Sequence, residues 1–293
     1  MDKKKFKYKL LLLLGLLARW VSLEAVNVDK LNDIFTSMHS PFNYDLQLKI
    51  LPGEKLDAEL FICLHGMGSD STISTVMRAN PAILPFHVIA FNFPDYGRRY
   101  KEGVKTTFGT FDEIAPALFI LKKCIVDGRA DKVHLYGFSA GGSAALNCVA
   151  VLNSSRYDTE MQKLGIGEKE KQRILHSIQQ GSVVLEVPLK SFDEIADISG
   201  DRDVRLVARR AKKNGMTPID NIKELRNLAL NCFIYFAHPD RILGNKDDAE
   251  FIKRFKDANE NGRTVALIGN NSGHTAYHPE LWKAYKKFVL ESN

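Results

Sequence analysis

Short apolar runs recur along the chain and are separated by longer segments with helical spacing. The strand candidates lie at residues 44–51, 60–64, 88–93, 133–136, 182–188, 231–237 and 264–268. Apolar residues at helical spacing predict helices at residues 28–38, 111–126, 140–152, 247–258 and 280–290. Strands that alternate with helices predict the α/β class, with a mostly parallel central sheet covered by helices on both faces.

Two charged segments with sparse apolar residues, 153–180 and 189–229, interrupt this regular pattern. Insertions that follow the strands of an open α/β sheet lie over the carboxyl ends of those strands, where ligands bind. We therefore expect both segments to form a cap on a single domain that spans residues 26–293. The alternative is a set of solvated surface helices, and we favour this reading for residues 202–213.

The N-terminus combines a lysine-rich opening with an apolar run of nine residues, 10–18, that ends at Arg19. This run is shorter than the roughly 20 residues that a membrane-spanning helix needs. Its length and its basic flank predict a secretory signal peptide within residues 1–25, cleaved after Ala25 or Ser22, and hence a secreted or periplasmic protein. The alternative is an uncleaved N-terminus that associates the protein with a membrane.

Charge and cysteine content exclude several classes of function. The net charge of +6 falls to +2 without residues 1–25, which hold six cations and two anions, so charge does not indicate a nucleic-acid partner. The four cysteines fall in predicted core elements and form no C-x-x-C pair, so neither a disulfide framework nor a zinc site is indicated. Buried thiols are slightly more typical of a reducing compartment, which weakens the prediction of export.

A G-x-S-x-G sequence at residues 137–141 follows directly on the strand at 133–136 and precedes a run of small residues. A serine held in a sharp strand-to-helix turn presses the residues two before and two after it against the backbone, where only glycine fits. Ser139 is then the exposed tip of the turn. A helix that begins at Ala140 would direct its free N–H groups toward the same point. The bland alternative is an ordinary glycine-rich turn.

A serine hydroxyl is a poor nucleophile unless a base activates it and a carboxylate orients that base. Asp240 follows the strand at 231–237, and His274 follows the strand at 264–268. The order serine, aspartate, histidine, each just past its own strand, resembles that of the α/β-hydrolase fold superfamily over residues 44–290. The resemblance implies that Ser139 is the nucleophile, His274 the general base and then acid, and Asp240 the residue that orients the imidazole.

The segment His65-Gly66-Met67-Gly68 resembles the H-G-x-G turn that follows the third strand in this superfamily. The resemblance implies that the backbone N–H groups of Met67 and Ala140 form the oxyanion hole. Other assignments remain open. His278 is an alternative base, and Asp193 or Glu194 is an alternative acid.

The remaining histidines and acidic residues have structural interpretations. His65 is expected to form a structural hydrogen bond, His238 to belong to loop scaffold, and His134 to be a core histidine with its hydrogen bonds satisfied. Asp247 and Asp248 are expected to be charges at a helix N-terminus.

The function predicted from these motifs is hydrolysis of a carboxylic ester or thioester through an acyl-enzyme, with a small-molecule acyl substrate and no metal or organic cofactor. A serine peptidase or an acyltransferase could use the same three residues. A protein of this fold that only binds a partner is the alternative from a different class, and such proteins usually lack one of the three residues. The sequence does not indicate the substrate or the oligomeric state.

Overall fold

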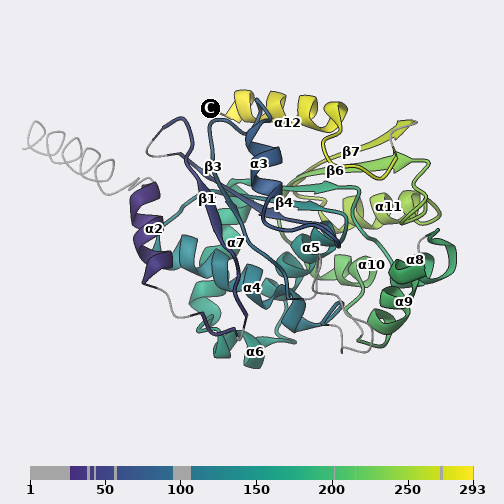
Figure 1. The fold of residues 1–293 in the computed structure, drawn as a ribbon, viewed down its shortest axis with the longest axis horizontal. Coiled ribbons are helices and arrows are strands. Elements are labelled where there is room, and N and C mark those ends of the chain that lie inside the picture. Colours follow the sequence, from purple (N-terminus) through teal and green to yellow (C-terminus); the bar gives the residue numbers. More distant parts are fainter. Residues whose placement is uncertain are drawn as a thin grey trace, which may run out of the picture.

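The computed structural model describes residues 27–37, 40–42, 44–55, 58–94, 107–200, 202–214, 216–270 and 273–292. Within these described residues, seven strands form one sheet in the order β1-β3-β2-β4-β5-β6-β7 (Figure 1). β1 pairs antiparallel with β3, and the other five neighbouring pairs are parallel. The strands are β1 (Lys49–Leu51), β2 (Leu60–Leu64), β3 (His87–Ala90), β4 (Val133–Phe138), β5 (Ser182–Glu186), β6 (Asn231–His238) and β7 (Arg263–Asn270).

Helices cover both faces of this sheet, which confirms the predicted α/β class. Figure 1 shows α3 and α12 on one side of the sheet and α4, α5 and α7 on the other. The helical elements are α2 (Val28–Thr36), α3 (Ile73–Arg78), α4 (Phe111–Lys122), η2 (Lys123–Asp127), α5 (Ala140–Leu152), α6 (Asp158–Lys163), α7 (Glu168–Gln180), α8 (Phe192–Ile198), α9 (Arg202–Ala211), η3 (Lys212–Asn214), α10 (Pro218–Asn221), η4 (Ile222–Leu225), α11 (Asp248–Ala258) and α12 (Pro279–Ser292).

The strand order reverses direction between β2 and β4. From β2 the chain moves outward to β3 and then returns to β4 on the other side of β2. In an open α/β sheet, the crevice at the carboxyl ends of the strands on either side of this reversal is where ligands bind. The loop that begins at His65 follows β2, and Ser139 follows β4, so the topology brings these two segments together.

The two faces of the sheet are packed differently. Toward α12 the core is aromatic, and the ring of Phe61 on β2 lies 5.9 Å from that of Tyr136 on β4 and 6.0 Å from that of Tyr285 on α12. Toward α5 the core contains small residues, and every residue of this helix is buried. Small side chains let the α5 backbone approach the sheet closely, which places its N-terminus directly at the end of β4.

The two segments expected to form a cap differ in their position. Residues 168–180 form α7, which packs against α5, β4 and β5 and therefore belongs to the helical layer rather than to a cap. The reason is an apolar stripe, Ile174, Leu175 and Ile178, that is buried while the opposite face of α7 carries the charges.

The first part of the second segment, residues 189–200, contacts a loop at the carboxyl end of a strand. Lys190 donates from Nζ to the carbonyl of Gly244 in the loop after β6, and the backbone N–H of Lys246 in that loop donates to Glu194 on α8. Residues 189–200 thus pack against the loop that carries Asp240. The later part of the segment, α10 and η4, packs against α5 instead.

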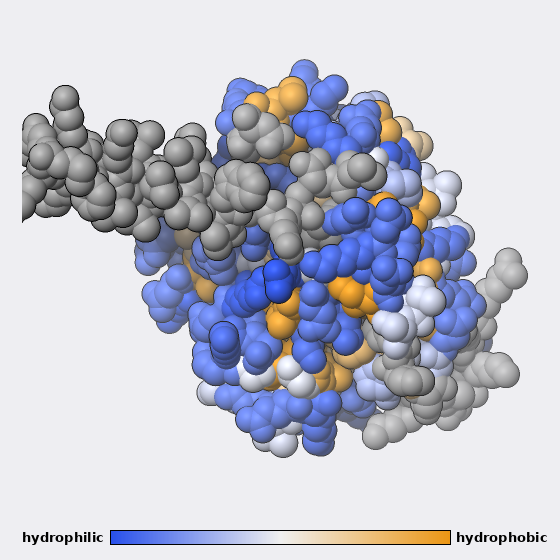
Figure 2. All heavy atoms as spheres, turned by 90° about the vertical axis from the view of Figure 1, so that its left-hand side faces the viewer, coloured by the Kyte–Doolittle hydropathy of each residue, from blue (hydrophilic) through white to orange (hydrophobic). Residues whose placement is uncertain are grey.

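The predicted leader, residues 1–25, lies outside the described residues and stays a prediction, as does the site of cleavage. Within the described part of the chain, no helix is long and apolar enough to cross a membrane. The face in Figure 2 is mostly hydrophilic, and its hydrophobic residues form small separate areas.

Candidate functional site

Ser139 occupies a strained turn between β4 and α5, and at 6 % exposed it is buried rather than the exposed tip that the sequence predicts. Its backbone has φ 54° and ψ −120°, in the region that L-residues rarely adopt. A Cβ on Gly137 would lie 2.2 Å from the carbonyl oxygen of Gly141, and one on Gly141 would lie 2.1 Å from that of Leu64. No side chain can make contacts this short, so only glycine at these two positions allows the backbone segments around Ser139 to pack this closely, as the G-x-S-x-G spacing predicts.

The structure brings Ser139, His274 and Asp240 into one chain of hydrogen bonds. His274 Nε2 lies 3.0 Å from Ser139 Oγ, and His274 Nδ1 lies 2.8 Å from Asp240 Oδ2. Because a carboxylate only accepts hydrogen bonds, the shared proton on the Asp240 side is on Nδ1, which leaves Nε2 free to accept the serine proton. This is the arrangement in which an imidazole acts as a general base toward a hydroxyl group.

Asp240 is held by the loop that carries it. Oδ1 accepts the backbone N–H groups of Ile242 at 2.8 Å and Leu243 at 2.9 Å. Burial alone would raise the pKa of Asp240, but the hydrogen bond and charge of His274 and these two N–H groups outweigh burial and keep that pKa below its ordinary value. The carboxyl group is therefore ionised at neutral pH and fixed in orientation.

The loop after β2 lies against the serine. A Cβ on Gly66 would be 3.2 Å from the Cβ of Ser139, so the backbone at this residue passes close to the turn. Met67 follows Gly66 in that loop, and Ala140 is the first residue of α5. No hydrogen bond joins the N–H of Met67 or of Ala140 to another described residue. Their predicted role as oxyanion donors stays a proposal.

Each alternative base or acid has other partners. His278 lies in a buried contact with Glu186, with Nδ1 2.9 Å from Oε1. Asp193 is largely exposed and pairs with Lys212, and Glu194 forms an ion pair with Lys190 at 3.2 Å. Among the described residues, the carboxylate that contacts His274 is that of Asp240.

The other histidines predicted to be structural also have partners. The ring of His65 contacts the carbonyl of Gly66 through Nδ1 at 2.9 Å, and burial lowers its pKa. The ring of His134 lies between Glu59, 2.8 Å from Nε2, and Ser182, 2.8 Å from Nδ1.

Asp248 is the first residue of α11, as expected, but its side chain also forms a buried ion pair that the sequence does not predict. Its side chain is 3 % exposed and contacts Lys190, itself 2 % exposed, and His238, whose Nε2 lies 2.7 Å from Oδ2. Asn245 joins this cluster to the site, because its Nδ2 donates to Asp248 while its Oδ1 accepts the backbone N–H of Asp240.

Glu186, Lys190 and Asn245 contribute to the surroundings of the site but belong to none of the sequence motifs. Two of them carry a signal that could have found them, since Glu186 stands directly between the apolar residues 183–185 and Val187, and Lys190 follows Val187-Pro188-Leu189. A charged side chain in such surroundings requires a buried partner. Asn245 has no comparable signal, because an asparagine in a loop is common for many reasons.

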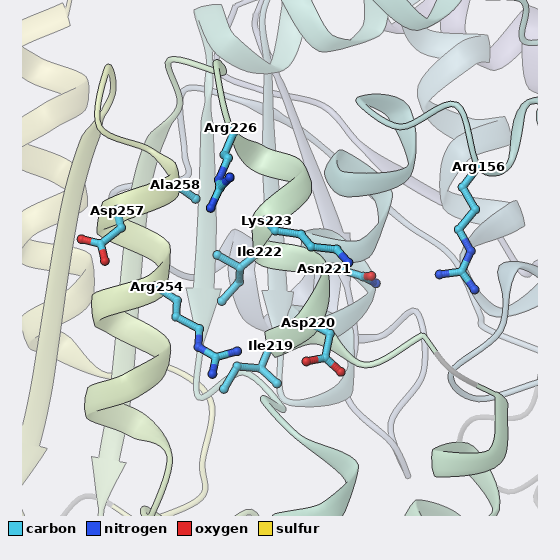
Figure 3. Close-up of a pocket in the computed structure, with 10 residues that line it drawn as sticks. All are labelled: Arg156, Ile219, Asp220, Asn221, Ile222, Lys223, Arg226, Arg254, Asp257 and Ala258. Atoms are coloured by element: carbon cyan, nitrogen blue, oxygen red, sulfur yellow. The ribbon is translucent and has the colours of Figure 1, made fainter.

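One open cavity, of about 430 Å³, lies beside His274 and is lined by Pro239, Arg241, Ile242, Gly273 and His274. A second, of about 590 Å³, lies in the helical layer and is lined by residues of α10, η4 and α11 with Arg156 (Figure 3). In Figure 3 the side chain of Arg254 on α11 points toward Ile219 and Asp220. No candidate site residue lines this second cavity, whereas His274 lines the first.

In the part of the chain that the structure describes, no cluster of three or more histidine, cysteine or acidic side chains could hold a metal ion. The four cysteines are free and buried, and burial raises the pKa of each thiol.

Solved structures of other proteins have the same architecture. The esterase Est2 of Thermogutta terrifontis is 14% identical, with 86% of this chain and 91% of that chain covered at a TM-score of 0.58. A carboxylesterase of Bacillus cereus is 16% identical, with 86% and 96% covered at a TM-score of 0.52. A monoacylglycerol lipase of Paleococcus ferrophilus is 16% identical, with 85% and 98% covered at 0.50.

No protein-family model matches the sequence, and no curated protein matches it. At these identities the structural likeness establishes the fold and does not by itself establish the activity. The protein has the α/β-hydrolase fold, as the order of its motifs predicts.

Proposed function

We propose that this protein is a serine hydrolase that cleaves small carboxylic esters through an acyl-enzyme on Ser139. The observation that carries the proposal is the pair of hydrogen bonds, 2.8 Å and 3.0 Å long, that links Asp240 through His274 to a serine in a strained turn. Backbone strain at a buried hydroxyl needs a reason, and presentation of a nucleophile is the usual one. The esterases and the lipase with the same fold make an ester the first substrate class to test.

In the first half of the reaction, Ser139 Oγ attacks the carbonyl carbon of the ester while its proton passes to His274 Nε2. The negative charge that forms on the carbonyl oxygen is placed toward the N–H groups of Met67 and Ala140. Each such donor is worth about 3–4 kcal/mol of barrier. The tetrahedral intermediate collapses when the bond to the alkoxy oxygen breaks and His274 gives its proton to the departing alcohol.

In the second half, a water molecule takes the place of the alcohol. His274 Nε2 removes one proton from this water as its oxygen attacks the acyl carbon, and then returns that proton to Ser139 Oγ. The products are a carboxylic acid and the regenerated serine. Asp240 keeps its charge throughout and stabilises the imidazolium that forms in each half.

The test is hydrolysis of p-nitrophenyl esters of graded acyl length by the wild type and by Ser139→Ala. We expect kcat to fall by a factor on the order of 10⁵ in the variant, because the nucleophile is lost. Ser155→Ala is the matched control, since Ser155 is exposed and is not one of the candidate site residues. A fluorophosphonate probe should label the wild type and Ser155→Ala, but not Ser139→Ala.

Retention of most activity in Ser139→Ala would show that another residue is the nucleophile. Absence of both turnover and labelling in folded wild-type protein would instead support a non-catalytic binding protein of this fold. The same set of substrates, extended to a thioester and a peptide amide, separates the esterase from the thioesterase and the peptidase.

A further inference from the structure

Glu186 is a carboxyl group buried completely in the middle of the sheet. It is the last residue of β5, which lies between β4 and β6, and its exposed fraction is 0 %. A carboxyl group in such a position is costly unless several donors satisfy it. The hydrogen-bond partners of this carboxyl group therefore indicate the role of Glu186.

Three donors reach the Glu186 carboxyl group. Tyr136 Oη on β4 donates to Oε2 at 2.7 Å, whereas the backbone N–H of His278 donates to Oε1 at 2.6 Å and His278 Nδ1 lies 2.9 Å from the same oxygen. The ring of His278 also stacks on that of Tyr235 on β6, with the centroids 4.2 Å apart. These contacts fasten His278, and with it the start of α12, to the centre of the sheet.

His278 is four residues from His274, at the end of the loop that carries the candidate base. Two residues of the described part of this loop, Gly273 and Tyr277, have positive φ values of 64° and 72°. A short loop with such backbone angles holds its shape only when its ends are fixed. β7 fixes the end that precedes the loop, and the bonds to Glu186 fix the end that follows it.

The main chain of Glu186 contacts the nucleophile as well. Its carbonyl oxygen accepts the backbone N–H of Ser139 at 3.0 Å. The same residue thus bonds through its main chain to the turn that carries the serine, and through its side chain to the loop that carries the histidine.

We propose that Glu186 is a positioning residue that sets the distance between Ser139 Oγ and His274 Nε2, by holding the 273–278 loop to the end of β5. This role rests on the proposed serine hydrolase function. Glu186 touches no substrate in this scheme, and it acts through His278. A displacement of the reacting groups by about 1 Å can cost on the order of 10²-fold in rate, so the loss of one such tie has a measurable effect.

The test replaces Glu186 and, separately, its partner His278. Glu186→Gln keeps the shape of the side chain but has one acceptor oxygen, so it cannot serve both Tyr136 and His278. We expect kcat for an ester substrate to fall by about 10- to 100-fold, with KM changed by less than about threefold. His278→Phe keeps the stacking on Tyr235 and loses the Nδ1 contact, and we expect a smaller fall in kcat.

Two matched controls separate positioning from stability. Tyr136→Phe removes a bond to the same carboxyl group without touching the 273–278 loop. Glu113→Gln changes another buried carboxyl group, on α4, which accepts the backbone N–H of Gly109. Both controls should lower the thermal midpoint as Glu186→Gln does, yet keep kcat within about threefold of the wild type. If kcat falls as far in the controls as in Glu186→Gln, the role is structural only and the proposal is wrong.

A second measurement does not depend on turnover. The proton on His274 Nδ1 is observed by proton NMR at low field and assigned by its loss in His274→Gln. We expect this resonance to shift or broaden in Glu186→Gln and to stay in place in Tyr136→Phe. An unchanged resonance together with wild-type kcat in Glu186→Gln overturns the proposal.

The outcomes for the two proposals are distinct. Activity retained in Ser139→Ala would refute the hydrolase mechanism alone, because the NMR comparison still reports on the role of Glu186. If Glu186→Gln does not fold, His278→Phe decides the matter by the same two readouts. An unchanged kcat and resonance in that variant then overturn the inference.

Discussion

Replacement of Asp240 by asparagine is the sharpest single test of the candidate site. In the wild type, Oδ1 accepts two backbone N–H groups, and Oδ2 faces His274 Nδ1. The single oxygen of asparagine will keep the two backbone bonds, since they lie on one side of the group, so the NH₂ group must face His274. Nδ1 then has to accept a hydrogen bond and gives up its proton.

The exchange therefore places the imidazole proton on Nε2, directed toward Ser139 Oγ. An Nε2–H cannot accept the serine proton, so the general base is lost although the three side chains stay in place. The expected loss in kcat is on the order of 10⁴, which corresponds to about 5.5 kcal/mol of barrier. The free energy of unfolding should change by much less, about 1–2 kcal/mol, because the bonds that shape the loop remain.

The assay is kcat and KM for a p-nitrophenyl ester, with urea unfolding of the same samples. Asp193→Asn is the matched control, because Asp193 is 63 % exposed and pairs with Lys212, and it should leave kcat unchanged. A D240N variant that keeps more than about a tenth of wild-type kcat contradicts the tautomer argument. A larger loss of kcat in Asp193→Asn than in D240N would indicate that Asp193, in the segment after β5, is the carboxylate that orients His274.

Two further predictions concern stability. Lys190→Met leaves the Asp248 carboxylate buried without the lysine, and loss of one partner of a buried pair costs about 3–5 kcal/mol. The urea midpoint should therefore fall well below that of Lys223→Met, which changes an exposed lysine on η4. Because the pKa of Asp240 is lower in the folded than in the unfolded chain, its ionised form stabilises the fold above pH about 4, and this contribution is lost as the pH falls further. The difference in free energy of unfolding between wild type and D240N should therefore shrink from pH 6 to pH 3, and a constant difference would contradict the lowered pKa of Asp240.

The central strands could be predicted from the sequence because burial on both faces leaves a direct trace in composition. Every residue of β2 and of β5 is buried; β2 is apolar throughout, and the centre of β5 is the apolar run Val183-Val184-Leu185. β1 at the edge is shorter than the alternating stretch at 44–51 predicts, because only three of its residues pair with β3. α3, with six residues, is too short to show a helical period and was not predicted.

The charge of residues 168–180 predicted a cap, whereas these residues form α7 in the helical layer. A helix that packs on a sheet buries one stripe and exposes the rest, so most of its residues can be charged. Lys171 shows the difficulty, because it is only 7 % exposed on α7, yet its Nζ reaches the carbonyl of Ser154 and the carboxylate of Asp158. A count of charges cannot tell such a residue from a solvated one.

The positions of Ser139, Asp240 and His274 were predictable because each follows its own strand, and parallel strands end at one edge of the sheet. Contacts between residues far apart in the chain leave no such trace. Glu186 and His278 are separated by 92 positions, and neither lies in a motif. His278 drew attention only as an alternative base, whereas the structure commits its ring to Glu186 and Tyr235.

The order of the strands explains why hydrogen bonds of Glu186, at the end of β5, would affect the distance between Ser139 and His274. Ser139 follows β4, Asp240 follows β6 and His274 follows β7, so β5 separates the nucleophile from the other two groups and contributes none of the three. Any change in the spacing of β4 and β6 at this edge would alter the Ser139–His274 distance. Glu186 bonds to Ser139 on one side and to His278 on the other, and so it spans this gap with hydrogen bonds no longer than 3.0 Å. Among β4 to β7, β5 is the strand that precedes no residue of the proposed triad, and in our proposal it holds the other three strand ends at the spacing that the triad needs.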